Sequence, residues 1–212
     1  MLQQDNHTKI SCKFEENNVV IRELSEKEVI SIYTTYSVLH FPAAERKPVS
    51  AIAHMTAAGT YKGYGLYHEE QLLCYALFAV LPDRQNILLD YLAVLEEYRS
   101  LGIGTLFLNH MRKNITEYNG FLIEVENPDY AKSSGELSIR KKRIDFYYKN
   151  EAYFTGILAE IFEVFYRVLY FPILEKPPVK TLFEDFTSIY ANMVPAKYHD
   201  TSVHIYLPET CE

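Results

Sequence analysis

Apolar and aromatic residues concentrate in three short runs in the first half of the chain. The runs extend from Tyr61 to Tyr67, from Leu72 to Leu81 and from Ile87 to Leu95. Polar connections of a few residues, His68 to Gln71 and Pro82 to Asn86, separate them. Consecutive strands joined by such short turns pair in antiparallel order, so this stretch is predicted to be a three-stranded meander.

Two helices are expected before this meander. Ser25 and Glu28 have the spacing of a capping box, in which each side chain accepts a hydrogen bond from the backbone of the other. This helix should continue to about Leu39. A second helix is expected to begin near Pro48, a residue that is favoured in the first turn, and to end at Gly59.

A helix, a strand and another helix are predicted after the meander. Apolar residues at helical spacing indicate a helix from Gly102 to Lys113, and Gly120 is expected to end it. The apolar run from Phe121 to Glu126 follows as a strand. Because a helical crossover separates it from the third strand of the meander, the two strands should be parallel. A polar loop then leads into a helix from about Leu137 to Lys149.

The last sixty or so residues are expected to add strands and one helix. The β-rich run from Ile157 to Ile173 predicts one or two strands. Apolar positions from Thr181 to Met193 recur at helical spacing. Val203, Ile205 and Leu207 alternate with polar or aromatic neighbours and indicate a final strand.

The most informative motif lies between the third strand of the meander and the next helix. Arg99 to Gly104 reads R-x-x-G-x-G. Unpaired amides at a helix N-terminus, glycines without a Cβ and a basic residue together favour a bound phosphate group. The spacing matches neither the dinucleotide fingerprint G-x-G-x-x-G nor the P-loop G-x-x-x-x-G-K-[ST]. The alternative is a strand–turn–helix junction in which the glycines only form a tight turn.

This motif, preceded by the apolar triplet Leu92 to Val94, resembles the acyl-CoA signature of the GNAT superfamily of N-acetyltransferases. The order of elements between Tyr61 and Tyr153 is similar to that family as well. The resemblance implies an α/β fold, in which helices flank a mixed, twisted sheet. We expect one domain over residues 1–212, with a C-terminal extension from about residue 156 that departs from the family.

The resemblance also implies acetyl-CoA as co-substrate and assigns residues to it. The backbone of Leu92, Ala93 and Val94 would pair with the pantetheine arm, and amides from Leu101 to Thr105 would hold the pyrophosphate, with charge added by Arg99. The full set of expected cofactor-binding residues is Leu92, Ala93, Val94, Arg99, Ser100, Leu101, Gly102, Ile103, Gly104, Thr105 and Asn127.

Phe146 and Tyr147 match an aromatic pair of many relatives, in which the tyrosine protonates the CoA sulfur. A phenol, whose pKa is about 10, stays protonated at neutral pH and can act as a general acid. Tyr147 is therefore the predicted acid, and Tyr148 is its alternative. The alternative role for Tyr147 is that of a core aromatic. Relatives often have glycine shortly afterwards, where this chain has Glu151, so the turn after the helix is open to question.

The general base is less clearly indicated than the acid. Glu124 and Glu126 lie two residues apart on a strand, so both point to one face. Glu124 is taken as the candidate base, although either carboxylate could bind a cationic amine or only its neighbouring backbone. Asp90 is a further candidate. Some relatives carry a glutamate base at the position of Leu88, so no family base transfers directly.

Composition narrows the classes of partner. The net charge of −7 over 212 residues disfavours nucleic acid and is compatible with a cationic substrate. Three scattered cysteines, Cys12, Cys74 and Cys211, show no zinc spacing and no disulfide framework. No apolar run is long enough for a transmembrane helix, and the polar segment 1–18 has no signal-peptide pattern. We therefore expect a cytoplasmic protein without a metal, nucleic-acid or membrane partner.

The predicted function is transfer of an acetyl group from acetyl-CoA to a primary amine of a small molecule or a protein. A non-catalytic module that binds acyl-CoA is the first alternative, and a transferase for longer acyl chains is the second. The basic run from Arg140 to Arg143 is expected to be a solvated helix face, with contact to the CoA 3′-phosphate as its alternative. The aromatic C-terminal segment either covers the core or forms a homodimer face.

Overall fold

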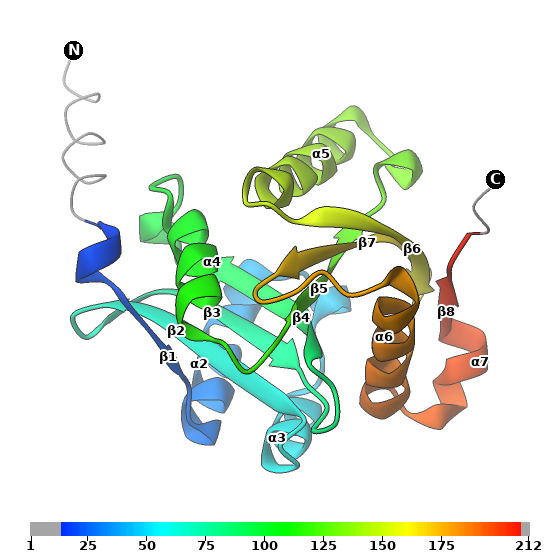
Figure 1. The fold of residues 1–212 in the computed structure, drawn as a ribbon, viewed down its shortest axis with the longest axis horizontal. Helices are drawn as coiled ribbons and strands as arrows, with labels where there is room; N and C mark the ends of the chain where they lie inside the picture. Colours follow the sequence, from blue (N-terminus) through cyan, green and yellow to red (C-terminus); the bar gives the residue numbers. More distant parts are fainter. Residues whose placement is uncertain (1–13, 209–212) are drawn as a thin grey trace. The chain divides into compact units, whose positions relative to one another are not determined.

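The computed structural model describes residues 14–208, which form a mixed eight-stranded sheet flanked by helices (Figure 1). The strand order is β1-β2-β3-β4-β5-β7-β6-β8. The strands are β1 (Val20–Glu23), β2 (Tyr61–His68), β3 (Gln71–Ala79), β4 (Asn86–Val94), β5 (Gly120–Glu126), β6 (Tyr153–Ile161), β7 (Val164–Pro172) and β8 (Val203–Tyr206). The α-helices are α2 (Glu26–His40), α3 (Val49–Ala57), α4 (Ile103–Asn114), α5 (Ser134–Lys149), α6 (Val179–Met193) and α7 (His199–Ser202). The α/β fold class expected from the sequence is confirmed.

The described residues form two compact units. The first unit holds residues 14–78 and 90–115, and the second holds residues 79–89 and 116–208. The chain passes from one unit to the other inside β3, between Phe78 and Ala79, inside β4, between Leu89 and Asp90, and again after Ile115. The expectation of one domain with a C-terminal extension from about residue 156 remains a prediction.

The predicted capping box begins the first long helix of the first unit. The Ser25 hydroxyl accepts from the Glu28 backbone N–H at 3.4 Å, and the Ser25 N–H donates to the Glu28 carboxylate at 2.9 Å. Hydrogen bonds from Arg22 and Ser25 hold the pKa of Glu28 at about 2. The sequence did not reveal β1, because only Ile21 of its four residues is buried and no alternation is visible.

Three helices, α2, α3 and α4, pack against the strands of the first unit. Helices α2 and α3 contact each other and β2, whereas α4 contacts β1. Figure 1 shows α4 in front of the strands of this unit. The core is unusually rich in tyrosine, with Tyr33, Tyr61, Tyr64 and Tyr75 all almost fully buried.

The second unit begins with a parallel strand pair, as the crossover predicted. Residues Asn86–Leu89 of β4 pair in parallel with Gly120–Ile123 of β5. The expectation that Gly120 ends the preceding helix is wrong, because α4 already ends at Asn114 and Gly120 is the first residue of β5. A Cβ at this position would collide with the carbonyl oxygen of Phe171 on β7. The glycine is therefore required by the close approach of the two strands.

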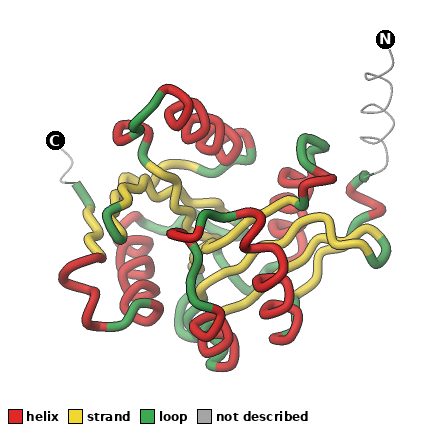
Figure 2. The backbone as a smooth tube through the Cα atoms, turned by 180° about the vertical axis from the view of Figure 1, so that it is seen from behind, coloured by secondary structure: helices red, strands yellow, loops and turns green. Residues whose placement is uncertain are grey.

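Helix α5, the β6–β7 hairpin, helices α6 and α7 and the short strand β8 complete the second unit (Figure 2). Strand β5 pairs with β7, β7 with β6, and β6 with β8, all antiparallel. The predicted strand region from Ile157 to Ile173 thus covers all of β7 and the second half of β6, which begins earlier, at Tyr153. The predicted helix and final strand are α6 and β8. Along the chain, α6 separates β7 from β8.

The turn between β6 and β7 places two large residues in a conformation that favours glycine. Phe162 and Glu163 have φ angles of 47° and 68° and link the paired residues Ile161 and Val164. Such a two-residue turn with both φ angles positive prefers Asn-Gly.

We expect Glu163→Gly to raise the free energy of unfolding by about 1 kcal/mol, because it removes the contact between Cβ and backbone in the left-handed region. Urea unfolding monitored by circular dichroism measures this change. Glu160→Gly, within the extended part of β6, is the matched control and should lower stability. A Glu163→Gly protein that is no more stable than the wild type would contradict the prediction.

Candidate active site

The R-x-x-G-x-G segment forms a tight junction between β4 and α4 in the first unit. A short 3₁₀ turn, Glu96–Tyr98, follows β4. Ser100 and Gly102 then adopt left-handed φ angles of 62° and 80°. These two positive φ angles reverse the chain so that α4 starts directly after Gly102.

The first turn of α4 presents backbone amides without a side-chain cap. Its N-cap residue is Gly102, which has no side chain, and its first turn contains no acidic residue. The first helical hydrogen bond runs from the Leu106 N–H to the Gly102 carbonyl at 3.0 Å, which leaves the amides of residues 103–105 without intrahelical partners. Ile103 anchors this turn with a fully buried side chain. The local geometry therefore suits an anion, which would meet unpaired N–H groups and the positive end of the helix dipole.

Arg99 lies at the surface beside this helix end. Its side chain is exposed, and its Nε donates to the Val94 carbonyl at 3.4 Å. Thr105 in the first turn is exposed as well. The predicted cradle residues from Arg99 to Thr105 thus come together in one unit, with a cation and free amides next to each other.

The burial pattern of β4 changes at Asp90. Residues 86–89 are all buried, whereas residues 90–94 alternate between half-buried and buried. The half-buried members are Asp90, Leu92 and Val94, which share one face of the strand because side chains alternate. Leu92, Ala93 and Val94 belong to the same unit as the cradle, as their assignment to one cofactor requires.

An aromatic cluster near the cradle was not expected from the sequence. The rings of Tyr36 and Tyr75 both lie about 6 Å from that of His40 (6.0 Å and 5.8 Å between centroids), and His40 Nδ1 lies 3.1 Å from the Tyr75 hydroxyl. Burial and the positive charge of Arg99 lower the pKa of His40. His40 is therefore neutral at pH 7.

Glu124, the candidate base, lies on β5 in the second unit. Its carboxylate accepts a hydrogen bond of 2.7 Å from the hydroxyl of Tyr190 on α6. The sequence did not indicate this partner, because 66 positions separate the two residues. The contact fixes the orientation of the Glu124 side chain.

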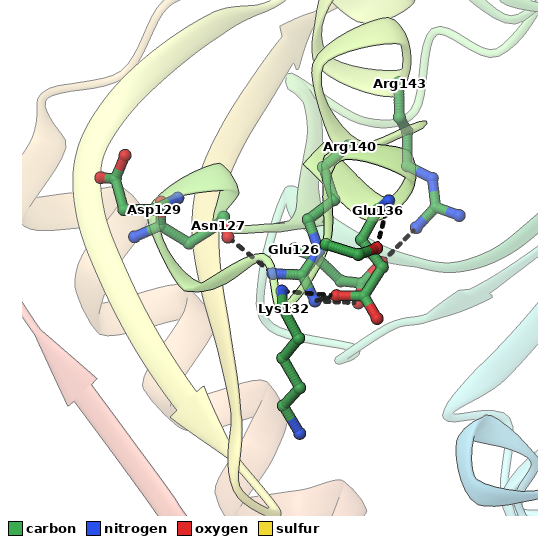
Figure 3. A network of polar contacts seen from close by, with 8 residues as sticks. Glu126, Asn127, Asp129, Lys132, Glu136, Arg140 and Arg143 are labelled. Atoms are coloured by element: carbon green, nitrogen blue, oxygen red, sulfur yellow. Dashed lines mark hydrogen bonds and ion pairs between the residues drawn. The ribbon is translucent and has the colours of Figure 1, made fainter. Parts of the chain in front are cut away.

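Glu126 and Asn127 belong to a polar network at the end of β5, which Figure 3 shows. Arg140 of α5 donates to the Glu126 carboxylate at 3.0 Å and to the Asn127 carbonyl at 2.8 Å. Arg143 lies 3.4 Å from the other carboxylate oxygen of Glu126. The network thus ties the middle of α5 to the end of β5.

The side chain of Asn127 is oriented by two donors. Its Oδ1 accepts from the Asp129 backbone N–H and from Arg167 Nε, both at 3.1 Å. Since both partners donate, the amide oxygen must face them, and the Nδ2 group points elsewhere. The Asn127 Nδ2 group makes no hydrogen bond within residues 14–208, so it can still serve the predicted cofactor role.

The expectation of a solvated basic face from Arg140 to Arg143 is wrong for Arg140. Its side chain is only 11% exposed and is bonded to Glu126. Lys141 and Lys142 are exposed as expected. The helical spacing of these basic residues did not distinguish Arg140 from the exposed lysines, because the carboxylate that binds Arg140 belongs to β5 and not to the same helix.

We expect Arg140→Ala to lower the free energy of unfolding by about 1–3 kcal/mol, because it leaves the Asn127 carbonyl without its charged donor and leaves Glu126 with only the longer contact to Arg143. Arg143→Ala is the matched control, since this exposed side chain reaches the same carboxylate at 3.4 Å. Its effect should stay within about 0.5 kcal/mol. Thermal unfolding of both variants measures the difference, and equal effects would show that the network does not hold α5.

Tyr147, the candidate acid, lies on α5 in the second unit and is 7% exposed. Its ring meets that of Phe146 edge-on at 5.1 Å between centroids. Tyr148, the alternative, is 43% exposed. The low exposure of Tyr147 is compatible with a core aromatic as well as with an acid that is shielded from water.

The turn after α5 forms although glycine is absent. Glu151 adopts a left-handed φ of 70°. The Ala152 and Glu151 N–H groups donate to the carbonyls of Tyr147 and Tyr148, both at 3.0 Å. These two bonds define a Schellman motif, whose left-handed position is usually glycine. The concern raised by Glu151 in the sequence therefore does not apply to the backbone of this turn.

Residues 14–208 contain neither a candidate metal site nor a helix that could span a membrane. No group of three or more histidine, cysteine or acidic side chains within residues 14–208 could hold a metal ion. None of the helices in this part of the chain is long and apolar enough to cross a membrane. Cys74 is buried and unpaired, and Cys12 and Cys211 lie outside the described residues.

Comparison with known proteins gives matches in structure only. No protein-family model and no curated protein matches the sequence. A GNAT-family protein from Bacteroides thetaiotaomicron superimposes with a TM-score of 0.57 at 14% identity, covering 86% of this chain and 97% of that one. The ribosomal-protein-S18-alanine N-acetyltransferase of Escherichia coli gives 0.53 at 15% identity, over 75% and 96%.

A third match is Naa50 of Arabidopsis thaliana, solved in complex with the bisubstrate analogue CoA-Ac-MVNAL. It has a TM-score of 0.51 and 20% identity, and the alignment covers 73% of this chain and 98% of that one. Together these structures show that the chain has the GNAT fold, as the motif between β4 and α4 predicted.

Proposed function

We propose that this chain, which has the GNAT fold, transfers the acetyl group of acetyl-CoA to a primary amine. One observation carries the proposal. The R-x-x-G-x-G segment lies at the exit of β4 and places unpaired amides of α4 beside Arg99, in the same fold that binds a CoA-containing analogue in Naa50. A pyrophosphate is the group of acetyl-CoA that such a cradle fits.

The reaction proceeds by direct attack within a ternary complex. The backbone of Leu92 to Val94 pairs with the pantetheine arm, and the amides of residues 103–105 hold the pyrophosphate. The Asn127 Nδ2 group donates to the cofactor. Positioning of the two reactants supplies a large part of the rate enhancement, because it replaces a bimolecular encounter. Tyr147 then protonates the departing CoA thiolate, and Glu124 accepts a proton from the amine.

Calorimetric titration with acetyl-CoA tests the cofactor assignment. Binding at sub-millimolar concentration is expected, and Arg99→Glu should weaken it about tenfold because it brings a negative charge to the pyrophosphate. Lys142→Glu changes the net charge equally at an exposed position of α5 and is the matched control. Wild-type protein that does not bind acetyl-CoA would overturn the proposal.

Acetyl transfer itself is measured as free thiol released across a panel of primary amines. A panel with small amines and peptide N-termini also addresses the acceptor class. Competition by longer acyl thioesters tests the preference for acetyl. A cytoplasmic location, a homodimer and the lack of nucleic-acid and membrane partners remain predictions.

A non-catalytic module that binds acyl-CoA is the second candidate. The contact between Glu124 and Tyr190 and the low exposure of Tyr147 favour it, because both candidate catalytic groups are engaged or buried. This candidate predicts binding of acetyl-CoA without any time-dependent release of thiol over the whole amine panel.

A further inference from the structure

Asp90 holds an ammonium group in the first unit. Lys47 Nζ lies 2.7 Å from Asp90 Oδ1, and the Tyr61 hydroxyl donates to Asp90 Oδ2 at 2.5 Å. The Asp90 side chain is only 8% exposed, whereas that of Lys47 is 26% exposed. The ammonium therefore closes the solvent side of a nearly buried carboxylate.

The backbone at Lys47 is fixed without help from its side chain. The Lys47 N–H donates to the Tyr91 hydroxyl at 3.2 Å, and the Tyr33 hydroxyl donates to the Lys47 carbonyl at 2.7 Å. The Tyr91 hydroxyl in turn donates to the Glu45 carbonyl at 2.8 Å. Because these three hydrogen bonds already hold the segment, the ion pair with Asp90 is not needed to attach it to β4.

The surroundings of the ammonium have the chemistry of a primary-amine site. A carboxylate binds one side of it, and the Tyr91 ring centroid lies 5.4 Å away, within range of a cation–π contact. Burial, followed by the charge of Asp90, raises the pKa of Tyr61. Tyr61 thus remains a donor that occupies the second oxygen of Asp90 and leaves the first for an ammonium.

The site lies on the strand that carries the proposed cofactor residues. Asp90, Leu92 and Val94 form the half-buried face of β4, and Leu92 is two residues from Asp90. Two residues along a strand span about 7 Å. An ammonium bound at Asp90 is therefore close to the backbone assigned to the pantetheine arm.

We propose that Asp90 and Tyr61 bind the primary ammonium of the acceptor, and that Lys47 fills this place until the acceptor arrives. The inference rests on the proposed acetyl transfer and specifies its substrate class as a cationic primary amine. Lys47 then acts as an internal competitor that the acceptor displaces.

The bound ammonium gives one proton to Asp90, which passes it to water. The neutral amine attacks the thioester carbon, so that a C–N bond forms and the C–S bond breaks. Glu124 accepts the second proton from the nitrogen, and Tyr147 protonates the CoA thiolate to the thiol. Proton exchange through water then restores Glu124 and Tyr147. The products are an N-substituted acetamide, CoA and one proton.

Rescue of Lys47→Ala by n-butylammonium tests the binding site directly. We expect a saturable rise in Tm of about 4 °C at ten times the Kd, because the added ammonium replaces that of Lys47. Tetramethylammonium, which cannot donate a hydrogen bond, should have a much smaller effect at equal ionic strength. The wild type should respond only weakly, because n-butylammonium must first displace Lys47, and Lys47→Ala/Asp90→Asn should not respond.

Lys62→Ala is the matched control. Lys62 pairs with Glu23 at 3.3 Å in the same unit, and its side chain is 32% exposed. This exposed pair should show no rescue. If Lys47→Ala does not fold, Lys47→Ser serves in its place, because serine is nearly as small as alanine and also removes the ammonium group. Equal rescue of the Lys47 and Lys62 variants, or none in either, would overturn the proposal.

A second measurement separates this inference from the proposed function. With acetyl-CoA present, Lys47→Ala should convert n-butylamine to N-butylacetamide at least about tenfold faster than the wild type, because the internal competitor is gone. If acetyl-CoA binds and n-butylamine rescues Lys47→Ala but is not acetylated, Asp90 is not the acceptor site, and the proposed function still stands. If acetyl-CoA does not bind, the proposed function itself fails.

Discussion

Tyr147→Phe is expected to lower kcat for acetyl transfer by about 100-fold or more, with little change in KM for acetyl-CoA. General acid catalysis contributes about this much, and the substitution removes only the proton donor. The ring and its contact with Phe146 are retained, so α5 should stay folded. Steady-state thiol release, measured with the amine that reacts fastest in the panel, gives both constants.

Tyr148→Phe is the matched comparison, because it removes a neighbouring hydroxyl from a residue that is 43% exposed. A loss confined to Tyr148→Phe would transfer the acid role to that residue. Unchanged turnover in both variants would remove tyrosine from the mechanism altogether. Circular dichroism of each variant shows that any loss reflects chemistry rather than unfolding.

Asp185→Ala is expected to lower the free energy of unfolding by about 3 kcal/mol, the largest effect on stability that we foresee. Asp185 of α6 is 2% exposed. It accepts from Arg84 NH1 at 2.9 Å and from Asn86 Nδ2 at 2.7 Å. The Asn86 Oδ1 accepts from the buried Tyr170 hydroxyl at 2.6 Å. Alanine at this position leaves the buried Asn86 Nδ2 group and the partly exposed Arg84 guanidinium without this acceptor.

A double-mutant cycle with Arg84→Ala measures the coupling within this group. The sum of the two single losses in the free energy of unfolding should exceed the loss in the double variant, because removal of both partners leaves fewer unpaired groups. Asp185→Asn preserves the volume and one acceptor, so it should lie between the wild type and Asp185→Ala. Urea unfolding provides the values, and strictly additive losses would argue against the coupling.

Local signals in the sequence were sufficient for most elements of the fold. The capping box at Ser25 and the periodic runs gave the helices and strands within a few residues, because each element buries one regular face. β1 was missed since only one of its four residues is buried. The role of Gly120 was misassigned, because its need for glycine comes from the passing backbone of β7 and not from a helix end.

The sequence predicted the cradle of the candidate site well, but it did not predict the partners of the carboxylates. The cradle depends on neighbouring residues in the sequence, so Arg99 to Gly104 were sufficient to indicate it. The contacts of Asp90, Glu124 and Glu126 come from partners that are 43, 66 and 14 positions away. Nothing local to these carboxylates distinguishes one that binds an internal cation from one that is open to substrate.

The short strand β8 has a consequence for solubility. It pairs with Leu158–Ile161 of β6 and is the last strand of the sheet. A protein shortened after α6 would present those N–H and C=O groups of β6 to other molecules, and open strand edges of this kind promote association. With only four residues, β8 itself offers a poor template for further pairing. Strand β8 thus also shields the β6 edge of the sheet from self-association.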